Sequence, residues 1–411
     1  MKKVLVIGYV WPEPDSSAAG RHMMSIMRLY KKQGWHVEFV SSAQPTERMA
    51  DLKGDGISSR RIVLNCDSFD LYITEYQPDI VMFDRFITEE QFGWRVEKNC
   101  PGALKIIDTE DLHCLRNARH QAVKDNREFT KTDLFSDIAK REIAAILRSD
   151  ISLVISGFEM ELLVNTFKVD INLLHHLPFM VDLSQCPEQP ISFSDRKHFI
   201  TVGNFRHAPN WDAVLCLQKI WPLIKAKIPE AELHIYGSYP PPKATALNDP
   251  KTGFLIKGWA EDIFLVMEKS RVCLAPLRFG AGIKGKLLDA MMMQTPSITT
   301  SMGSEGMYHQ EAWPGVITDD FTEFAEAAIQ LYNSEQEWLN AQANANALLK
   351  ARYDSCQLGA RLIEKISTVE KNLTQHRLTN FTGGMLKHHS MMSTQYMSQW
   401  IAEKNKKTRS S

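Results

Sequence analysis

The stretch from Pro276 to Met291 has the sequence PLRFGAGIKGKLLDAM. The apolar segment Val272–Ala275 before it is typical of a buried strand. After three glycines the pattern becomes that of a helix, with Lys284 and Lys286 in its first turns. Backbone N–H groups at a helix N-terminus, with ammonium groups nearby, bind phosphate or diphosphate. Asp289 offers a carboxylate to the vicinal hydroxyls of a ribose. By spacing alone, a glycine-rich turn with solvated lysines is an equally good interpretation.

Short apolar strands alternate with amphipathic helices on both sides of this stretch. The predicted strands are Val4–Val10, Val37–Ser41, Ile80–Phe83, Leu104–Ile107, Leu153–Ile155, His198–Val202, Glu232–Tyr236, Phe254–Ile256, Val272–Ala275 and Ser297–Thr299. The clearest helical patterns are Arg21–Gln33, Asp133–Arg148, Trp211–Ala226, Glu261–Ser270 and Lys284–Met293. Continuous apolar strands separated by helices predict parallel sheets covered on both faces. We therefore predict an α/β protein with two Rossmann-like, doubly wound domains that face a central cleft.

Breaks in this pattern give the expected domain boundaries. A stretch containing proline and serine, residues 182–190, interrupts the alternation and is typical of a linker. We expect an N-terminal Rossmann-like domain over residues 1–181, a linker over 182–197, a second Rossmann-like domain over 198–354, and C-terminal helices with a tail over 355–411. A polar, glycine-containing break at Asn372–Gly384 makes the last segment a separate short element.

The composition excludes several classes of protein. The 411 residues carry a formal net charge of −1, so no chain-wide positive field favours a nucleic-acid partner. Seven single cysteines without a CxxC pair favour a reducing, cytoplasmic compartment and give no zinc pattern. The first apolar run is short and meets Pro12 and Pro14, which favours a buried strand over a signal peptide. No stretch approaches the roughly 18 apolar residues of a membrane span.

Two common nucleotide-binding motifs are absent from the sequence. A dehydrogenase needs a GxGxxG turn after a strand, but the first strands of the two predicted domains are followed by Gly8–Pro12 and Gly203–His207. No Walker A loop is present either, which argues against an ATPase or kinase of that type.

Four regions together resemble family 4 glycosyltransferases of the GT-B fold. Asp289-Ala290-Met291, between the glycine-rich loop and Thr295–Ile298, is similar to the signature of that family. Trp11–Arg21 is similar to its acceptor-side glycine loop, which here includes Gly20 and Arg21. The remaining segments are Val202–Asp212, similar to the start of the donor domain, and Ile235–Ser238 with Ile256–Asp262, similar to the wall around the nucleotide base.

The resemblance implies a donor site in the second domain. The second acid of the family's paired-acid motif corresponds to Asp289 as the ribose ligand. The first acid, eight residues earlier, is replaced by Ala281, and this departure leaves the sugar contacts and the exact mechanism open. We prefer Arg206 to either lysine as the cation for the phosphates, because the family's later lysine position holds Asn210. The implied donor-binding residues are Arg206, Gly282, Ile283, Lys284, Lys286, Asp289 and Glu305. For Glu305, capping of a helix is an equally good interpretation.

Acceptor-side residues are expected at the ends of two strands in the first domain. Asp108, Asp111 and His113 follow one strand and are candidates for binding sugar hydroxyls or moving a proton, with helix capping as the alternative. Arg85 follows another strand and suits an acidic or phosphorylated acceptor, or equally a structural ion pair.

These observations predict a glycosyltransferase that moves a sugar from a nucleotide diphosphate sugar to a glycan or lipid-linked glycan. The family implies retention of configuration and no bound metal or other cofactor. A nucleotide-sugar epimerase of the same fold and a non-catalytic nucleotide-binding or scaffold protein are the alternatives.

A stripe of methionine, histidine and aromatic residues lies near the C-terminus. Residues 385, 389, 392, 396 and 400 share one helical face. Such a stripe suits a soft metal, but we favour packing against the protein or a partner. The basic residues that follow, Lys404, Lys406, Lys407 and Arg409, permit weak contact with an anionic membrane, and hence a peripheral position at its inner face.

Overall fold

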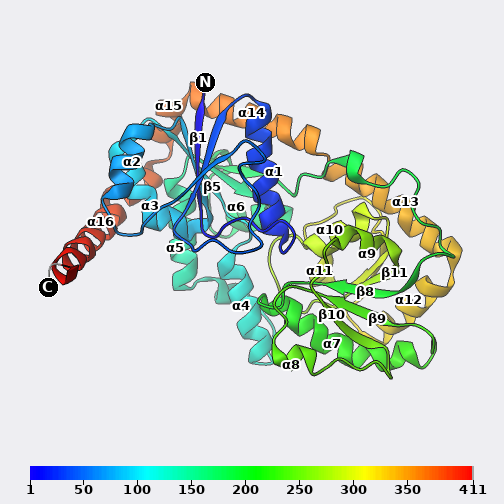
Figure 1. Ribbon diagram of the computed structural model, residues 1–411. Helices are drawn as coiled ribbons and strands as arrows, with labels where there is room; N and C mark the ends of the chain where they lie inside the picture. The colour runs from blue at the N-terminus through cyan, green and yellow to red at the C-terminus, as the bar shows by residue number, and fades with distance from the viewer. Residues whose placement is uncertain (410–411) are drawn as a thin grey trace.

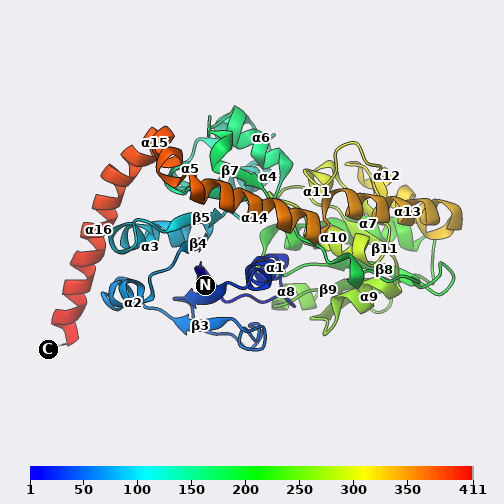
Figure 2. The ribbon, with the colours of Figure 1, turned by 90° about the horizontal axis from the view of Figure 1, so that it is seen from above.

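The computed structural model describes residues 1–409, without the side chains of residues 390, 391 and 405–409. It contains two parallel sheets, one in each half of the chain, and both expected Rossmann-like units are present (Figure 1). The last helices run back over the N-terminal half (Figure 2). No helix among the described residues is both long enough and apolar enough to cross a membrane.

The N-terminal sheet has seven strands in the order β3-β2-β1-β4-β5-β6-β7, all parallel. Its strands are β1 (Lys3–Gly8), β2 (His36–Ser41), β3 (Ser58–Arg61), β4 (Ile80–Asp84), β5 (Leu104–Asp108), β6 (Ile151–Val154) and β7 (Leu174–His176). Its helices are α1 (Ala18–Lys32), α2 (Ser68–Tyr76), α3 (Arg85–Asn99), α4 (His113–Lys124), α5 (Asp137–Arg148) and α6 (Gly157–Asn165), with 3-10 turns at Lys131–Leu134 and Ile171–Leu173. Every residue of β4, β5 and β6 is buried, because helices cover both faces of the sheet.

The C-terminal sheet has six parallel strands in the order β10-β9-β8-β11-β12-β13. They are β8 (Lys197–Val202), β9 (Leu233–Tyr236), β10 (Phe254–Gly258), β11 (Ser270–Ala275), β12 (Ser297–Thr299) and β13 (Gly315–Ile317). The helices are α7 (Ala208–Lys225), α8 (Pro242–Thr245), α9 (Ile263–Lys269), α10 (Gly285–Met292), α11 (Ser301–Ser304), α12 (Phe321–Asn333) and α13 (Glu335–Arg352). A 3-10 turn at Leu183–Gln185 lies in the segment between the two sheets.

All ten predicted strands are present, and the three further strands are short. β3 has the sequence SSRR and is exposed throughout, so it carries no apolar signal. β7 and β13 have three residues each and extend one edge of each sheet. Pairing with a neighbouring strand, rather than local sequence, determines such elements.

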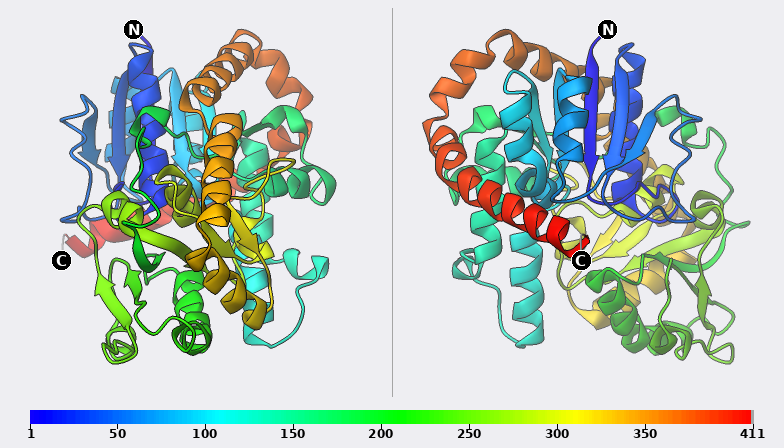
Figure 3. Two further views of the ribbon diagram at one scale, coloured as in Figure 1. Left: turned by 90° about the vertical axis from the view of Figure 1, so that its right-hand side faces the viewer. Right: turned by 60° about the vertical axis from the view of Figure 1, so that its left-hand side comes forward.

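The two chain crossings between the domains lie against each other. Val181, at the end of the first domain, forms a parallel bridge with Asp354, where the chain leaves the second domain. The Val181 amide donates to the Tyr353 carbonyl oxygen at 2.8 Å, and the Ser355 amide donates to the Val181 carbonyl oxygen at 2.9 Å. The helices α13 and α14 (Ser355–Lys371) then lead from the second domain back to the first (Figure 3).

The segment after residue 354, expected to end in a separate short element, instead packs on the N-terminal domain. Leu358, Leu362, Ile366 and Val369 of α14 belong to the same buried cluster as β1 and α1. Lys2 and Glu370 form an ion pair at 2.6 Å. α15 (Leu373–Thr379) and α16 (Phe381–Arg409) follow, and α16 lies against α3 and α5, on the side away from the second domain (Figures 1 and 2).

Candidate active site

A cavity of about 730 Å³ lies between the two domains. The N-terminal domain contributes the loop after β1, the start of α1 and the segments that follow β4 and β5. The C-terminal domain contributes the segments after β8 and β9, the glycine-rich loop after β11 and the first turn of α10. The carboxyl ends of both sets of parallel strands therefore meet at this cavity, whose volume is ordinary for a small-molecule site.

The glycine-rich loop is fastened to the N-terminal domain through Glu159 of α6. One oxygen of this buried carboxyl group accepts the Gly282 amide at 2.8 Å and the Leu112 amide at 3.0 Å. Gly282 has a φ of +62°, and a Cβ there would lie 3.0 Å from the Cβ of Asp111. The Gly282 amide, expected to face a diphosphate, is therefore already bonded within the protein. Burial raises the pKa of Glu159 to about 8, so this side chain is mostly protonated at neutral pH.

The two lysines of the loop differ in their partners. The ammonium group of Lys284 donates to the Gly282 carbonyl oxygen at 2.7 Å, so it supports the loop. Lys286 lines the cavity, and no described side chain pairs with its ammonium group. Burial lowers the pKa of each lysine to about 8. Lys286 is thus the better placed of the two to meet an anion. Ile283 also lines the cavity.

Asp289 and Arg21, predicted on opposite sides of the cleft, form an ion pair. One terminal nitrogen of Arg21 lies 2.6 and 2.7 Å from the two carboxylate oxygens of Asp289. Burial raises the pKa of Asp289, and the guanidinium opposes that shift. In this closed arrangement the predicted ribose ligand is therefore paired with the facing domain.

Gly20 serves packing, and the structure does not place it on the cavity wall. A Cβ at Gly20 would lie 2.5 Å from the carbonyl carbon of Glu13, so only glycine fits against this loop. Its amide donates to the Ser17 hydroxyl at 3.0 Å, which caps α1.

Asp111 and His113 both line the cavity, next to each other. Asp111 accepts a hydrogen bond from Arg116, and its other oxygen lies 3.7 Å from Nε2 of His113. Burial alone would raise the pKa of Asp111, but Arg116 and His113 lower it well below its usual range. Burial lowers the pKa of His113 to about 4, which keeps the imidazole neutral at physiological pH. The pair thus presents a carboxylate and a neutral imidazole to the cavity.

Asp108, predicted with these two residues, lies beneath the cavity and does not line it. It is 1% exposed, accepts the Glu110 amide at 3.2 Å, and lies 3.8 Å from the buried ring of His22. Glu110 lines the cavity in its place, with a left-handed φ of +58°. Burial raises the pKa of both carboxyl groups; repulsion from Asp84 adds to the shift of Asp108, and repulsion from Asp108 adds to that of Glu110.

Arg85 lines the cavity with a left-handed φ of +70°, but its charge is largely compensated. Its guanidinium donates to Asp84 at 3.1 Å, and Glu110 and Asp111 are further acidic neighbours. This surrounding favours the structural ion pair over a site for a phosphorylated acceptor. A non-glycine residue in this conformation at a strand end is nevertheless typical of functional sites.

Glu305 lies outside the cavity wall. Its two oxygens accept hydrogen bonds from Arg119 of α4 at 2.7 and 2.8 Å, and Arg119 also donates to the Gly280 carbonyl oxygen at 2.9 Å. The residue predicted to hold donor hydroxyls therefore links the two domains.

Arg206 lies at the exposed rim of the cavity, where its guanidinium stacks on the ring of Tyr239 at 3.6 Å. Tyr239 in turn donates to Glu13 of the N-terminal domain at 3.2 Å. The preferred cation therefore lines the cavity at its exposed rim, whereas the loop amides lie in its buried part.

Among the described residues, one group has a spacing compatible with a metal ion: His198, Glu232 and His234. These residues lie at the amino ends of β8 and β9, at the opposite edge of the sheet from the cavity. Nδ1 of His198 accepts a hydrogen bond from the Glu232 amide at 3.2 Å, which assigns the ring proton to Nε2. In this tautomer, Nε2 has no lone pair for a metal ion. His234 and Glu232 share a hydrogen bond of 2.7 Å, so the group is satisfied internally.

Comparison with known proteins finds sequence similarity in the second domain. Residues 196–334, which include β8 to α12, match a family model described as glycosyl transferases group 1. A relative from Klebsiella pneumoniae, named as an uncharacterized 44.6 kDa protein in a cps region, is 28% identical over 162 residues. The match covers 38% of this chain and 42% of that protein, so it spans less than half of the relative's length.

Solved structures resemble the whole two-domain body. A sucrose-phosphate synthase from Thermosynechococcus elongatus has a TM-score of 0.67 at 14% identity, over 90% of this chain and 99% of that one. Anabaena HepE in complex with UDP and glucose has a TM-score of 0.69 at 11% identity, over 90% and 100%. A TarM variant from S. aureus, in complex with fondaparinux, alpha-GlcNAc-glycerol and UDP, has a TM-score of 0.68 at 11% identity, over 90% and 100%.

The chain has the GT-B fold. In this GT-B structure, the contacts that hold the domains together involve residues that the sequence did not single out, above all Glu159 and Arg119. Each lies on a helix, where a single acid or base has no motif to distinguish it from a solvated side chain. Glu110 was visible beside its predicted neighbours, but its position on the cavity wall depends on a left-handed turn that the sequence does not mark.

Proposed function

We propose that this protein is a glycosyltransferase that moves a sugar from a nucleotide diphosphate sugar to a glycan or lipid-linked glycan. The observation that carries the proposal is the coincidence of the group 1 match over residues 196–334 with the wall of the interdomain cavity. The UDP named in the HepE and TarM structures supports a nucleotide diphosphate donor. The cps-region relative supports a role in making a polysaccharide of the cell envelope.

The donor is proposed to bind with its diphosphate between Lys286 and Arg206, near the start of α10. Departure of a nucleoside diphosphate requires neutralisation of its growing charge, which ammonium and guanidinium groups provide without a metal. Domain opening would release Asp289 from Arg21, so that the carboxylate binds the ribose hydroxyls. When the domains close again over the donor, Arg21 becomes a third cation for the diphosphate. This exchange reconciles the ion pair with the predicted role of Asp289.

The acceptor is proposed to bind against Asp111, His113 and Glu110. The ionised Asp111 accepts hydrogen bonds from sugar hydroxyls, and the neutral His113 accepts a proton. We propose retention of configuration, with the departing phosphate assisting removal of the acceptor proton. A cytoplasmic location is proposed because all seven cysteines are free thiols.

The test is a calorimetric and thermal-shift comparison of UDP, GDP, ADP and their common sugar conjugates, without added metal. One nucleotide diphosphate should stabilise the protein selectively. Asp289→Ala and Arg206→Ala should each weaken its binding roughly tenfold, the loss of about one charged hydrogen bond. His389→Ala, on the C-terminal helix, is the matched control and should leave binding unchanged.

Absence of stabilisation by every nucleotide in a folded sample would refute the donor site. Selective binding without transfer to any acceptor, and without hydrolysis of the sugar conjugate, would favour the non-catalytic binding protein instead. Chemical analysis of the anomeric product decides between retention and inversion.

A further inference from the structure

The long C-terminal helix α16 has two faces of different character, and the small residues face the protein. Gly383, Ser398 and Ala402 are buried against the N-terminal domain. A Cβ at Gly383 would lie 2.1 Å from the carbonyl oxygen of Leu147, so the helix could not approach α5 this closely with any larger residue. Ser398 donates to Asn65 at 2.9 Å.

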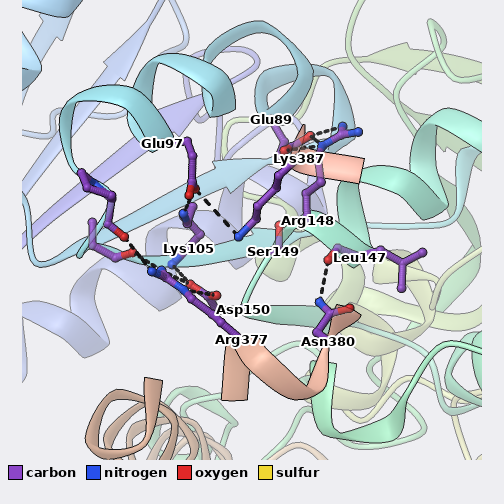
Figure 4. A network of polar contacts seen from close by, with 12 residues as sticks. Glu89, Glu97, Lys105, Leu147, Arg148, Ser149, Asp150, Arg377, Asn380 and Lys387 are labelled. Carbon is purple, nitrogen blue, oxygen red and sulfur yellow. Dashed lines mark hydrogen bonds and ion pairs between the residues drawn. The ribbon is translucent and has the colours of Figure 1, made fainter. Parts of the chain in front are cut away.

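Polar contacts fix the start of α16 and therefore its rotation about its own axis (Figure 4). Arg377, just before it in α15, bonds both oxygens of Asp150 at 2.8 and 2.7 Å and also donates to the Pro101 and Ala103 carbonyl oxygens. Asn380 donates to the Leu147 carbonyl oxygen at 2.7 Å. The ammonium group of Lys387 lies 3.8 Å from Glu97, on the inner side of the helix. A helix anchored in this way cannot turn its outer face onto the domain.

The large apolar residues of α16 lie on the outer face. Their side chains are between 43% and 79% exposed: Phe381, Met385, Met392, Tyr396, Met397 and Trp400. Four of them (Met385, Met392, Tyr396 and Trp400), with His389, form the stripe expected to pack against the protein or a partner. The prediction that the stripe packs against this chain's own domain is wrong, because these side chains face away from that domain. An exposed apolar stripe of this extent marks an interaction surface.

The charge of this segment is opposite in sign to that of the whole chain. Residues 381–411 contain the bases Lys387, Lys404, Lys406, Lys407 and Arg409 and one acid, Glu403, whereas the formal net charge of the chain is −1. The ammonium group of Lys404 lies 5.3 Å above the ring of Trp400. The side chains of Lys406, Lys407 and Arg409 lie outside the described residues. Cations that follow an aromatic and methionine stripe are complementary to an anionic lipid surface.

A second copy of the chain fits this face less well. A coiled-coil seam through Met385 and Met392 would also place His389, Tyr396, Gln399 and Glu403 at core positions, as the heptad spacing requires. Four such polar or amphipathic residues in one short seam oppose helix pairing. In a bilayer interface, by contrast, tyrosine and tryptophan place an apolar ring and a polar tip at the level of the head groups.

We propose that the outer face of α16 lies in the interface of an anionic phospholipid bilayer and holds the N-terminal domain against that surface. The helix lies along the membrane and does not cross it. The mode of attachment is independent of the donor site, so the two proposals fail separately. It leaves the second domain, on the other side of the molecule, away from the membrane (Figure 2).

The test is cosedimentation of the full chain with vesicles of phosphatidylcholine alone or with about one third phosphatidylglycerol, an anionic fraction chosen to give a strong surface potential. Binding to the anionic vesicles and its weakening by salt are expected. The double variant Tyr396→Ala/Trp400→Ala should lower the partition coefficient roughly tenfold, because two interfacial rings are lost. Leu339→Ala on α13, an exposed leucine of the second domain, is the matched control and should change nothing.

Equal binding of the double variant and the wild type would overturn the proposal, as would equal binding to both kinds of vesicle. A concentration-dependent dimer in sedimentation equilibrium that the double variant abolishes, with no vesicle binding, would identify a second copy as the occupant instead. Cooperative urea unfolding of the same samples shows that the variant is folded.

Discussion

Glu159 is the residue whose replacement tests the interdomain architecture most directly. Its single bonded oxygen accepts two buried amides, one from Leu112 in the first domain and one from Gly282 in the second. Glu159→Ala leaves both amides without an acceptor. Each orphaned buried donor costs about 1–3 kcal/mol, so we expect a loss of about 3 kcal/mol in the free energy of unfolding. Glu159→Gln keeps an acceptor oxygen in place and should cost less than about 1 kcal/mol at pH 5, where the wild-type side chain carries its proton in the folded protein.

The pH dependence of the Gln variant supplies a second, independent measure. The folded-state pKa of Glu159 is about 8, above its ordinary value of 4.5, so the folded protein retains a proton that the unfolded chain has lost. The contribution of this group is complete below pH 4.5 and is lost as the pH rises to 8. Across that window the wild type should lose about 1.4 kcal/mol per pH unit relative to Glu159→Gln, and the difference should become constant above pH 8.

Urea unfolding of the wild type and both variants, at pH values from 5 to 9, measures these differences. Equal destabilisation by Ala and Gln would refute the hydrogen-bond account, because only the first removes the acceptor. A difference between Gln and wild type that does not change with pH would show that Glu159 is already ionised in the folded protein.

Three further predictions concern the cavity, the domain contact and the C-terminal anchor. Affinity for a nucleotide diphosphate should be constant below pH 7 and fall up to tenfold per pH unit above pH 8. The reason is that the protonated form of Lys286 binds the diphosphate, and the pKa of Lys286 is about 8. Calorimetry of Lys286→Met should show little of this decline. Gly285→Ala should hinder closure of the two domains, because a Cβ there would lie 2.3 Å from the Cβ of Ala18. Small-angle scattering should show a more open particle for this variant. Adding Ala18→Gly should restore the compact particle. Arg377→Ala removes the ion-pair partner of the buried Asp150 and should cost about 3 kcal/mol in urea unfolding. A cost below about 1 kcal/mol would contradict the anchor in Figure 4.

The sequence by itself determined the architecture of both sheets. Segments such as Val4–Ile7 and Val272–Ala275 are continuously apolar because strands covered on both faces must be, and the pattern is local enough to read directly. Asp111 and His113 were placed at the cleft for a similar reason: they follow a strand, and the carboxyl ends of parallel strands share one edge. The exposed strand β3 was not predicted, because it has no apolar residue.

Only the tertiary structure decided which groups at this edge are free and which are already bonded. The amide of Gly282 and the carboxylates of Asp289 and Glu305 all suit a ligand in sequence, yet each is paired with a residue more than 100 positions away. The stripe on α16 shows the same limit, since periodicity defines a face but not its direction. Whether a polar group meets a ligand, or an apolar face meets the core, depends on contacts between distant segments. Those contacts form only when the two domains and the returning C-terminal helices come together.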